Sequence, residues 1–202
     1  MPRNIAPIVL GQPSPALTLP TVQGETISLD ALRGKQSAIL WFSRGYACPF
    51  CRQQMARLQL AYPRFKETGG EILQIAPGPL RTAKFYFMTH KLFFPYLVDD
   101  TFESYERYGL SDRGFPASFY YETRSWVKSI FGGLAAQIVA ARTDIWGRQI
   151  IRRLIHHTFT AYEQGVFIVD REGIVRFTRV VGAIGNIPSN EELLRELEKI
   201  SK

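Results

Sequence analysis

The stretch SAILWFSRGYACPFCR, residues 37–52, decides the fold. Its first part, residues 37–42, is mostly apolar and predicts a buried strand. The only two cysteines of the chain follow, in the order Cys48-Pro49-Phe50-Cys51, at the start of a predicted helix. Two thiols at this spacing at a strand-to-helix junction are typical of a redox-active dithiol. Unpaired N–H groups and the positive end of the helix dipole favour a thiolate at Cys48.

The predicted helix carries a regular apolar stripe. The members of the stripe recur at spacings of four, three, four and three residues: Cys51, Met55, Leu58, Tyr62 and Phe65. This pattern places Cys51 on the core face and leaves Cys48 at the open end of the helix. Pro49 falls near the first helical position, where a missing N–H is harmless. Pro63 is expected to kink or interrupt the helix, and Gly69-Gly70 to end it.

Two other interpretations of the cysteine pair are weaker. The cysteines could be inert buried residues that fall close together by chance. They could also form half of a zinc site, but zinc needs about four ligands and the chain has no second cysteine pair. His156-His157 has adjacent side chains rather than the usual ligand spacing. The sequence therefore predicts neither a metal nor a cofactor.

The patterns around this stretch predict an α/β protein with a thioredoxin-like order of elements. A central mixed sheet flanked by helices is expected, with a β-hairpin before it. The predicted elements are a hairpin at 16–19 and 26–29, a strand at 71–76, a helix at 80–92 with Phe85, Met88 and Leu92 on one face, a strand at 96–98, a short helix at 100–108, a hairpin at 166–170 and 174–180, and a last helix with a capping box at Ser189 and Glu192.

Residues 111–164 do not fit this order and are expected to form a helical insertion within a single domain, 1–202. The stretch 126–141 contains one charge, Lys128, and could cover the core, form a dimer interface or meet a membrane. The first two interpretations are favoured, because membrane-binding helices usually carry a richer basic face. The insertion precedes the strand that should run beside the cysteines, so its ends are expected near Cys48.

The charge balance is basic, with 25 Lys and Arg against 18 Asp and Glu and a formal net charge of +7. No block of Lys or Arg exceeds two residues, which favours a solvated surface over a face for nucleic acid or an acidic partner. Neither terminus resembles a secretory signal, and no stretch has the length of a membrane span. A cytoplasmic location is expected, where a catalytic dithiol suits the pair better than a structural disulfide.

Five segments in this order resemble the AhpC/TSA (alkyl hydroperoxide reductase/thiol-specific antioxidant) family of peroxiredoxins in the thioredoxin superfamily. The segments are 11–16 with Leu19-Pro20, 32–35, 43–52, 94–99 and 165–173. The Arg-Gly-x-x-Cys-Pro-x-Cys-Arg form at 44–52 and the long insertion are similar to a peroxiredoxin-like subgroup rather than to the typical enzymes. The resemblance implies a thioredoxin-like fold and a thiol-dependent antioxidant oxidoreductase.

The chain departs from the typical family motif at several positions. The motif places a Thr three residues before its cysteine and a Pro seven before, where this chain has Gly45 and Trp41. The typical arginine before the late strand aligns with Gln164. In the family, that Thr and Arg hold the peroxide and polarise its O–O bond. Cys51 stands where the motif carries a Glu, and the thioredoxin cis-Pro has no counterpart at 163–165.

The sequence and the resemblance together predict an enzyme in which Cys48 attacks and Cys51 resolves. Arg44 and Arg52 are candidates for stabilising the thiolate, and Gly45 and Pro49 shape the turn. The substrate is a hydroperoxide or a disulfide, and an external thioredoxin- or glutaredoxin-like thiol would reduce the enzyme again. A homodimer is compatible with the sequence. The alternative is a non-catalytic redox sensor or binding module, in which the Cys48–Cys51 disulfide gates partner binding.

Overall fold

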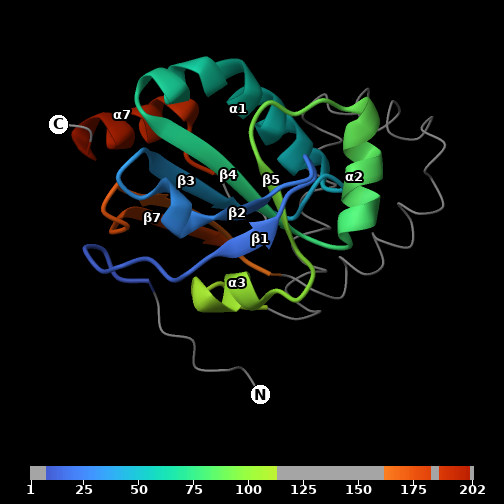
Figure 1. The fold of residues 1–202 in the computed structure, drawn as a ribbon, viewed down its shortest axis with the longest axis horizontal. Helices are drawn as coiled ribbons and strands as arrows, with labels where there is room; N and C mark the ends of the chain where they lie inside the picture. The colour runs from blue at the N-terminus through green and yellow to red at the C-terminus, as the bar shows by residue number, and fades with distance from the viewer. Residues whose placement is uncertain (1–7, 113–161, 183–186, 201–202) are drawn as a thin grey trace.

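The computed structural model of the chain describes residues 8–112, 162–182 and 187–200, with a mixed sheet at its centre (Figure 1). The strand order in this sheet is β5-β4-β3-β6-β7. The strands are β3 (Ser37–Phe42), β4 (Gly70–Pro77), β5 (Tyr96–Asp99), β6 (Gln164–Val169) and β7 (Val175–Gly182). β3, β4 and β5 are parallel, whereas β6 pairs antiparallel with β3, and β7 antiparallel with β6.

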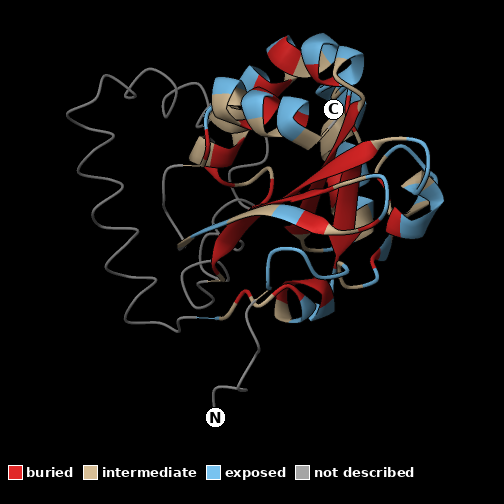
Figure 2. Cartoon of the chain, turned by 90° about the vertical axis from the view of Figure 1, so that its left-hand side faces the viewer, coloured by how far each residue is buried: buried red, intermediate tan, exposed pale blue. Residues whose placement is uncertain are grey.

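Helices and a hairpin cover the two faces of the sheet. One face packs against three helices: α1 (Pro49–Glu67), α2 (Leu80–Thr89) and α7 (Asn190–Ile200). The other face is covered by the hairpin of β1 (Thr18–Pro20) and β2 (Thr26–Ser28), the short helix η1 (Leu29–Leu32) and α3 (Glu103–Arg107). Figure 2 shows the strands largely buried between helices that present exposed outer faces. The described elements follow the predicted order.

The central strand β3 is buried along its whole length, as its apolar sequence predicts. It lies between β4 and β6, so both of its edges are paired. A strand that is covered on both faces and paired on both edges is one of the most rigid parts of a sheet. The chain leaves β3 at Phe42 and reaches the first cysteine within a short loop, so this strand fixes where the cysteines lie.

The expected interruption at Pro63 does not occur, because α1 continues through it to Glu67. Phe65 lies fully buried beyond the proline, and its packing holds the last turn in helical form. The helix then closes at Thr68, whose N–H and Oγ1 both donate to the carbonyl of Arg64, at 3.1 and 2.8 Å. Tertiary packing thus offsets the hydrogen bond that Pro63 cannot make.

The prediction that Phe85, Met88 and Leu92 form the apolar face of α2 is wrong. Phe85 and Met88 are 53% and 76% exposed, and Leu92 lies beyond the helix, which ends at Thr89. Ala83 and the partly buried Phe87 face the core instead. The small side chain of Ala83 allows α2 to approach the sheet closely. The buried side of the helix is therefore not the side that carries its largest apolar residues.

The last helix begins as predicted. The backbone N–H of Glu192 donates to Ser189 Oγ at 3.2 Å, which satisfies one of the open donors of α7. The carboxylate of Glu192 accepts from Arg179 Nη2 at 2.6 Å, so this side chain ties α7 to β7. Leu193, Leu194 and Leu197 are buried, as the apolar pattern predicts.

The expected insertion at 111–164 lies mostly outside the described residues, but its two ends are visible. Asp112 and Tyr162 form an antiparallel bridge. Glu163 Oε2 accepts from Ser111 N at 3.2 Å and from Ser111 Oγ at 2.9 Å. The chain therefore leaves and returns at neighbouring points, immediately before β6. Within the described ranges, no helix is long and apolar enough to cross a membrane.

Candidate active site

Both cysteines lie where β3 gives way to α1. Cys48 is the N-cap residue of α1, with extended backbone angles, and Pro49 is the first helical residue, as predicted. The N–H of Cys48 donates to the carbonyl of Gly45 at 3.2 Å, and the N–H of Arg52 donates to the carbonyl of Cys48 at 3.0 Å. These bonds close a tight turn before the first helical turn and leave the Cys48 side chain at the helix N-terminus.

Gly45 allows the loop before Cys48 to lie close to the sheet. Its φ is +81°, a conformation that residues with a Cβ rarely adopt. A Cβ at this position would also lie 3.1 Å from Tyr96 Oη and 3.6 Å from Ala76 Cβ. The next residue, Tyr46, donates its N–H to Tyr96 Oη at 3.2 Å. Glycine is therefore required both by the backbone angle and by the approach to Tyr96.

Ser43 anchors the start of this loop through a buried polar network. Its N–H donates to the carbonyl of Ile75 at 2.9 Å, and its Oγ accepts from Gly45 N at 3.1 Å and from Gln74 Nε2 at 2.9 Å. Tyr105 Oη donates to the carbonyl of Ser43 at 2.5 Å. These residues were not among those predicted from the sequence, although a glutamine inside the apolar run of β4 is a signal that could have pointed to Gln74.

The two thiols differ little in exposure. Cys51 is 1% exposed and faces the core, as the apolar stripe predicts. Cys48 is 9% exposed, so the end of the helix is less open than the sequence suggests. Packing around the helix N-terminus covers most of this side chain, and only a small part of it meets solvent.

The environment of Cys48 lowers its pKa from 9.0 to about 6. The largest contribution is the hydrogen bond that the Cys51 thiol donates to the Cys48 sulfur. Burial opposes this effect, since a charged group loses solvation. The positive charge of Arg44 and the backbone N–H groups of Cys51 and Phe50 at the helix N-terminus favour the thiolate further. At neutral pH the Cys48 side chain is therefore mostly a thiolate.

The environment of Cys51 acts in the opposite direction and raises its pKa well above the ordinary value. Burial is the main cause, followed by the hydrogen bond to Cys48 and the negative charge of the Cys48 thiolate. The Cys51 sulfur also lies 3.6 Å from Gln164 Oε1, to which its S–H can donate. The pair therefore consists of one thiolate and one neutral thiol, and the proton stays on Cys51.

The two candidate arginines occupy different positions. Arg44 lies in the loop, is buried, and its charge favours the thiolate at both cysteines. Arg52 lies half-buried in the first turn of α1. Because a cation in a buried setting is less screened by water, Arg44 is the better placed of the two to stabilise negative charge at Cys48.

An aromatic wall borders the loop on the side of α2. The ring of Tyr46 stacks on Tyr86 with a centroid distance of 4.5 Å, and Phe87 packs against Tyr96 at 4.6 Å. His90, at the end of α2, stacks on Tyr86 with a centroid distance of 4.2 Å. The Tyr46 contact joins α2 to the loop, and the Phe87 contact joins α2 to β5. No local pattern in the sequence predicts these two contacts, because each links segments that are separate along the chain.

The other residues that the sequence singled out have simpler surroundings. Trp41 is buried in the core, as expected, and its indole N–H lacks a hydrogen-bond partner among the described residues. His156 and His157 lie outside the described residues. In the part of the chain that the structure describes, no three His, Cys, Asp or Glu side chains gather as a potential metal site.

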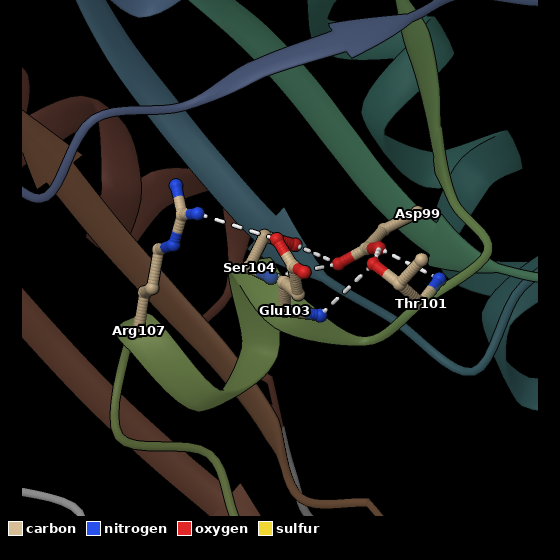
Figure 3. Close-up of polar contacts among 5 residues, drawn as sticks. All are labelled: Asp99, Thr101, Glu103, Ser104 and Arg107. Atoms are coloured by element: carbon tan, nitrogen blue, oxygen red, sulfur yellow. Dashed lines mark hydrogen bonds and ion pairs between the residues drawn. The ribbon is translucent and has the colours of Figure 1, made fainter.

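A second polar cluster lies at the end of β5, the outer of the three parallel strands (Figure 3). Asp99 accepts hydrogen bonds from the N–H and Oγ1 of Thr101, at 3.0 and 2.9 Å. It also accepts from the N–H of Ser104 at 2.8 Å and from Ser104 Oγ. Nearby, Glu103 and Arg107 form an exposed ion pair across one turn of α3. These residues and β1 line a shallow hollow of about 180 Å³. The carboxylate of Asp99 is fully engaged in starting α3.

Comparison with protein families and solved structures gives a consistent result. A model of the AhpC/TSA family matches residues 10–178. The chain is 29% identical over 131 residues to the thiol-disulfide oxidoreductase ResA of Halalkalibacterium halodurans, covering 64% of this chain and 72% of that protein. It is 30% identical over 103 residues to the putative peroxiredoxin bcp of Coxiella burnetii, covering 51% of this chain and 68% of that protein.

Two solved structures share the architecture. The peroxidoxin BcpB of Mycobacterium tuberculosis superposes with a TM-score of 0.62 at 15% identity, covering 95% of this chain and 97% of that chain. The reduced 2-Cys peroxiredoxin of Plasmodium vivax superposes with a TM-score of 0.64 at 17% identity, covering 95% and 81%. At these identities the likeness concerns the fold, and it confirms the predicted thioredoxin-like architecture.

Proposed function

Because the chain belongs to the AhpC/TSA family, we propose that it acts as a thiol-dependent oxidoreductase through Cys48 and Cys51. The observation that supports these residues most strongly is their placement, with Cys48 as the N-cap of α1 and Cys51 on the core face of the first turn. Their environments shift the two pKa values in opposite directions. A nucleophile must be a thiolate before it reacts, and a resolving thiol is best kept protonated until it is needed. Cys48 is suited to the first role and Cys51 to the second.

The proposed reaction has two steps. The Cys48 thiolate attacks one sulfur of a disulfide, which forms a mixed disulfide and releases the other sulfur as a thiolate. The Cys51 sulfur then attacks Cys48 Sγ, forms the Cys48–Cys51 disulfide, and releases the remaining substrate thiolate, which takes up the Cys51 proton. The substrate gains two electrons and the protein loses two. An external thiol of the thioredoxin or glutaredoxin type would reduce the protein again.

The first candidate substrate is therefore a disulfide. Gly45 offers no hydroxyl at the position where the family motif has a threonine. Gln164 is neutral where the family has an arginine, and its Oε1 lies 3.6 Å from Cys51 Sγ. Both groups that would polarise a peroxide O–O bond are thus replaced, whereas disulfide exchange requires only the thiolate and a resolving thiol.

The second candidate substrate is a hydroperoxide, which the family match and the relatives named as peroxiredoxins favour. In that route the Cys48 thiolate attacks the hydrogen-bearing oxygen of the peroxide, the O–O bond breaks, and Cys48 becomes a sulfenic acid. The other oxygen leaves with the bonding electron pair and takes up a proton from water to form an alcohol or water. Cys51 then condenses with the sulfenic acid and releases water. Arg44 is the cation best placed to assist, since its charge already acts on the Cys48 sulfur.

Two assays in parallel test the choice of substrate. Reduced protein should catalyse the reduction of insulin disulfides with a dithiol as electron source. Stopped-flow oxidation by hydrogen peroxide should be slower than in peroxiredoxins with the full motif by about a hundredfold to a thousandfold, as when one transition-state donor is removed. Oxidation at the rate of a fast peroxiredoxin, without insulin reduction, would reverse the order of the candidates. A protein that oxidises once and does not cycle with any reductase would instead be the redox sensor.

The proposed partner and location follow from the same chemistry. A Cys48–Cys51 disulfide must be reduced before the next turnover, so the cycle requires a compartment with a supply of reducing thiols. We place the protein in the cytoplasm on this ground. Fractionation with an antibody against the chain would test the location, and recovery in an oxidising compartment would contradict it.

A further inference from the structure

The first residue of β6, Gln164, contacts the resolving thiol. Gln164 is 4% exposed, and its Oε1 lies 3.6 Å from Cys51 Sγ, although the two residues are 113 positions apart in the chain. The backbone here has little freedom, because a Cβ on the adjacent Gly165 would lie 2.9 Å from Leu110 Cδ2 and 2.8 Å from Phe167 Cε2. The start of β6 is therefore fixed by packing, and it places the buried Gln164 side chain beside Cys51.

The single proton of Cys51 has two acceptors within reach. One is the Cys48 thiolate, and the other is Gln164 Oε1. In the resting protein the negative charge makes Cys48 the stronger acceptor, since hydrogen bonds to ions are stronger than those to neutral groups. After the first step, Cys48 carries a covalent partner and has no charge. Gln164 then becomes the better acceptor for the Cys51 S–H.

We propose that Gln164 is the positioning residue of the resolving step. When Cys48 has reacted, Gln164 Oε1 draws the Cys51 S–H away from Cys48, so that a lone pair on Cys51 Sγ faces Cys48 Sγ. The new S–S bond forms between these two atoms, and the substrate group leaves Cys48 with the bonding electron pair. This inference rests on the proposed function of the two cysteines.

The chemistry of an amide limits this role to orientation. A neutral amide oxygen accepts a hydrogen bond, but it does not hold a proton at neutral pH. The Cys51 proton therefore passes to the departing thiolate or to water, and Gln164 does not act as a base. A carboxylate in the same place would both accept the hydrogen bond and remove the proton, which gives a Gln164→Glu variant a distinct signature.

An aromatic disulfide, dithiobis(nitrobenzoate), separates the two steps. With one equivalent of this probe and the reduced protein, attack by Cys48 releases one coloured thiolate, and closure by Cys51 releases the second. Gln164→Leu keeps a similar volume and removes the acceptor. We expect its first phase to stay within about twofold of the wild type and its second phase to slow by about fivefold to tenfold, the effect of one lost hydrogen bond. Val180→Ala, on the neighbouring strand β7 and 46% exposed, should change neither phase by more than about twofold.

Gln164→Glu provides the second test, and it does so even if Gln164→Leu folds poorly. Its second phase should exceed that of Gln164→Leu and should accelerate as pH rises through the titration of the new carboxylate, a pH dependence that the wild type lacks. A wild-type second phase in Gln164→Leu, equal slowing of both phases, or a second phase in Gln164→Glu without the new pH dependence would overturn the proposal. Failure of the wild type to release a second thiolate would instead contradict the function proposed for Cys51.

Discussion

In two places in this molecule a strand is followed by an acidic side chain near the start of the next helix. The groups that surround the acidic side chain differ between the two places. β3 leads to Cys48 at the start of α1, and β5 leads to Asp99 at the start of α3. Asp99 accepts four hydrogen bonds, all from the hydroxyls and N–H groups of Thr101 and Ser104. The Cys48 sulfur is stabilised by the thiol of Cys51 and by the charge of Arg44. The donors around Asp99 only hold its carboxylate in place, so Asp99 has a structural role. The donor to Cys48 is a second thiol that can itself form a disulfide with it, so the Cys48–Cys51 pair can be a reactive centre.

Of these two groups, we expect the loss of the Cys48 thiolate to have the larger effect on activity. A Cys48→Ser variant should lose more than about a thousandfold in turnover with disulfide or peroxide, because a hydroxyl is not ionised at neutral pH. Cys51→Ser should keep the first attack and stop at the mixed disulfide, which mass spectrometry of the trapped protein would show. Residual turnover in Cys48→Ser comparable to the wild type would place the nucleophile elsewhere.

Removal of the other anion should affect stability rather than activity. Asp99→Ala leaves the donors of the buried Ser104, and those of the exposed Thr101, without their acceptor, and we expect the free energy of unfolding to fall by about 2 kcal/mol. The neighbouring Asp100 is exposed and serves as the matched control, with an expected change below about 0.5 kcal/mol in Asp100→Ala. Denaturant titration measures both. Equal losses in the two variants would show that the hydrogen bonds of Asp99 contribute little.

The loop between β3 and Cys48 should be sensitive to a single methyl group. Gly45→Ala introduces a Cβ at positive φ and 3.1 Å from Tyr96 Oη, and we expect a loss of about 2 kcal/mol in stability. Gly34 has a similar φ of +73°, and apart from its chain neighbours no atom lies within 4 Å of where its Cβ would be, so Gly34→Ala isolates the backbone effect. The difference between the two variants measures the contact with Tyr96. Equal losses would mean that the contact is relieved without cost.

The charge of Arg44 should have the smallest effect, and pH reveals it. The initial rate at which Cys48 reacts with a disulfide should rise with pH around a midpoint near 6, because the thiolate is the reactive form. Arg44→Met should raise this midpoint, so the rate near pH 6 falls by about threefold to tenfold and recovers at alkaline pH. Arg52→Met is the control and should leave the midpoint unchanged. A larger shift in Arg52→Met than in Arg44→Met would reverse the assignment.

The same pKa change has a consequence for stability. The folded-state pKa of Cys48 lies below its ordinary value of 9.0, so the folded protein binds the Cys48 proton more weakly than the unfolded chain does. The stabilisation from Cys48 is fully present above about pH 9 and is lost as pH falls through about 6. The free energy of unfolding of the reduced protein should therefore rise as pH increases across this range. The rise should be smaller in Cys48→Ala.

Local patterns were sufficient to predict the centre of the fold. The apolar run of β3, the stripe on α1, and the capping residue Ser189 each express a local rule, and the structure confirms them. The arrangement of the cysteines was predictable for the same reason. Their spacing and the helix period determine that Cys51 faces inward and that Cys48 begins the helix.

Features that depend on distant contacts were not predictable. The inward face of α2 was predicted wrongly, because the helix carries large apolar residues on more than one side. Contacts of Phe87 with Tyr46 and Tyr96 decide which side is buried. The contact of Gln164 with Cys51 joins two separate segments, and no local pattern indicates it. The helical insertion at 111–164 stays a prediction, since residues 113–161 lie outside the described ranges. The homodimer also stays a prediction, because a single chain does not test it.

Competitive alkylation distinguishes a Cys48 thiolate with a protonated Cys51 from the reverse arrangement. Reduced protein is treated at neutral pH with less than one equivalent of iodoacetamide, and the modified cysteine is located by peptide mass mapping. We expect Cys48 to carry nearly all of the label, because its pKa is lowered to about 6 while that of Cys51 is raised. Preferential labelling of Cys51, or equal labelling of both, would contradict it.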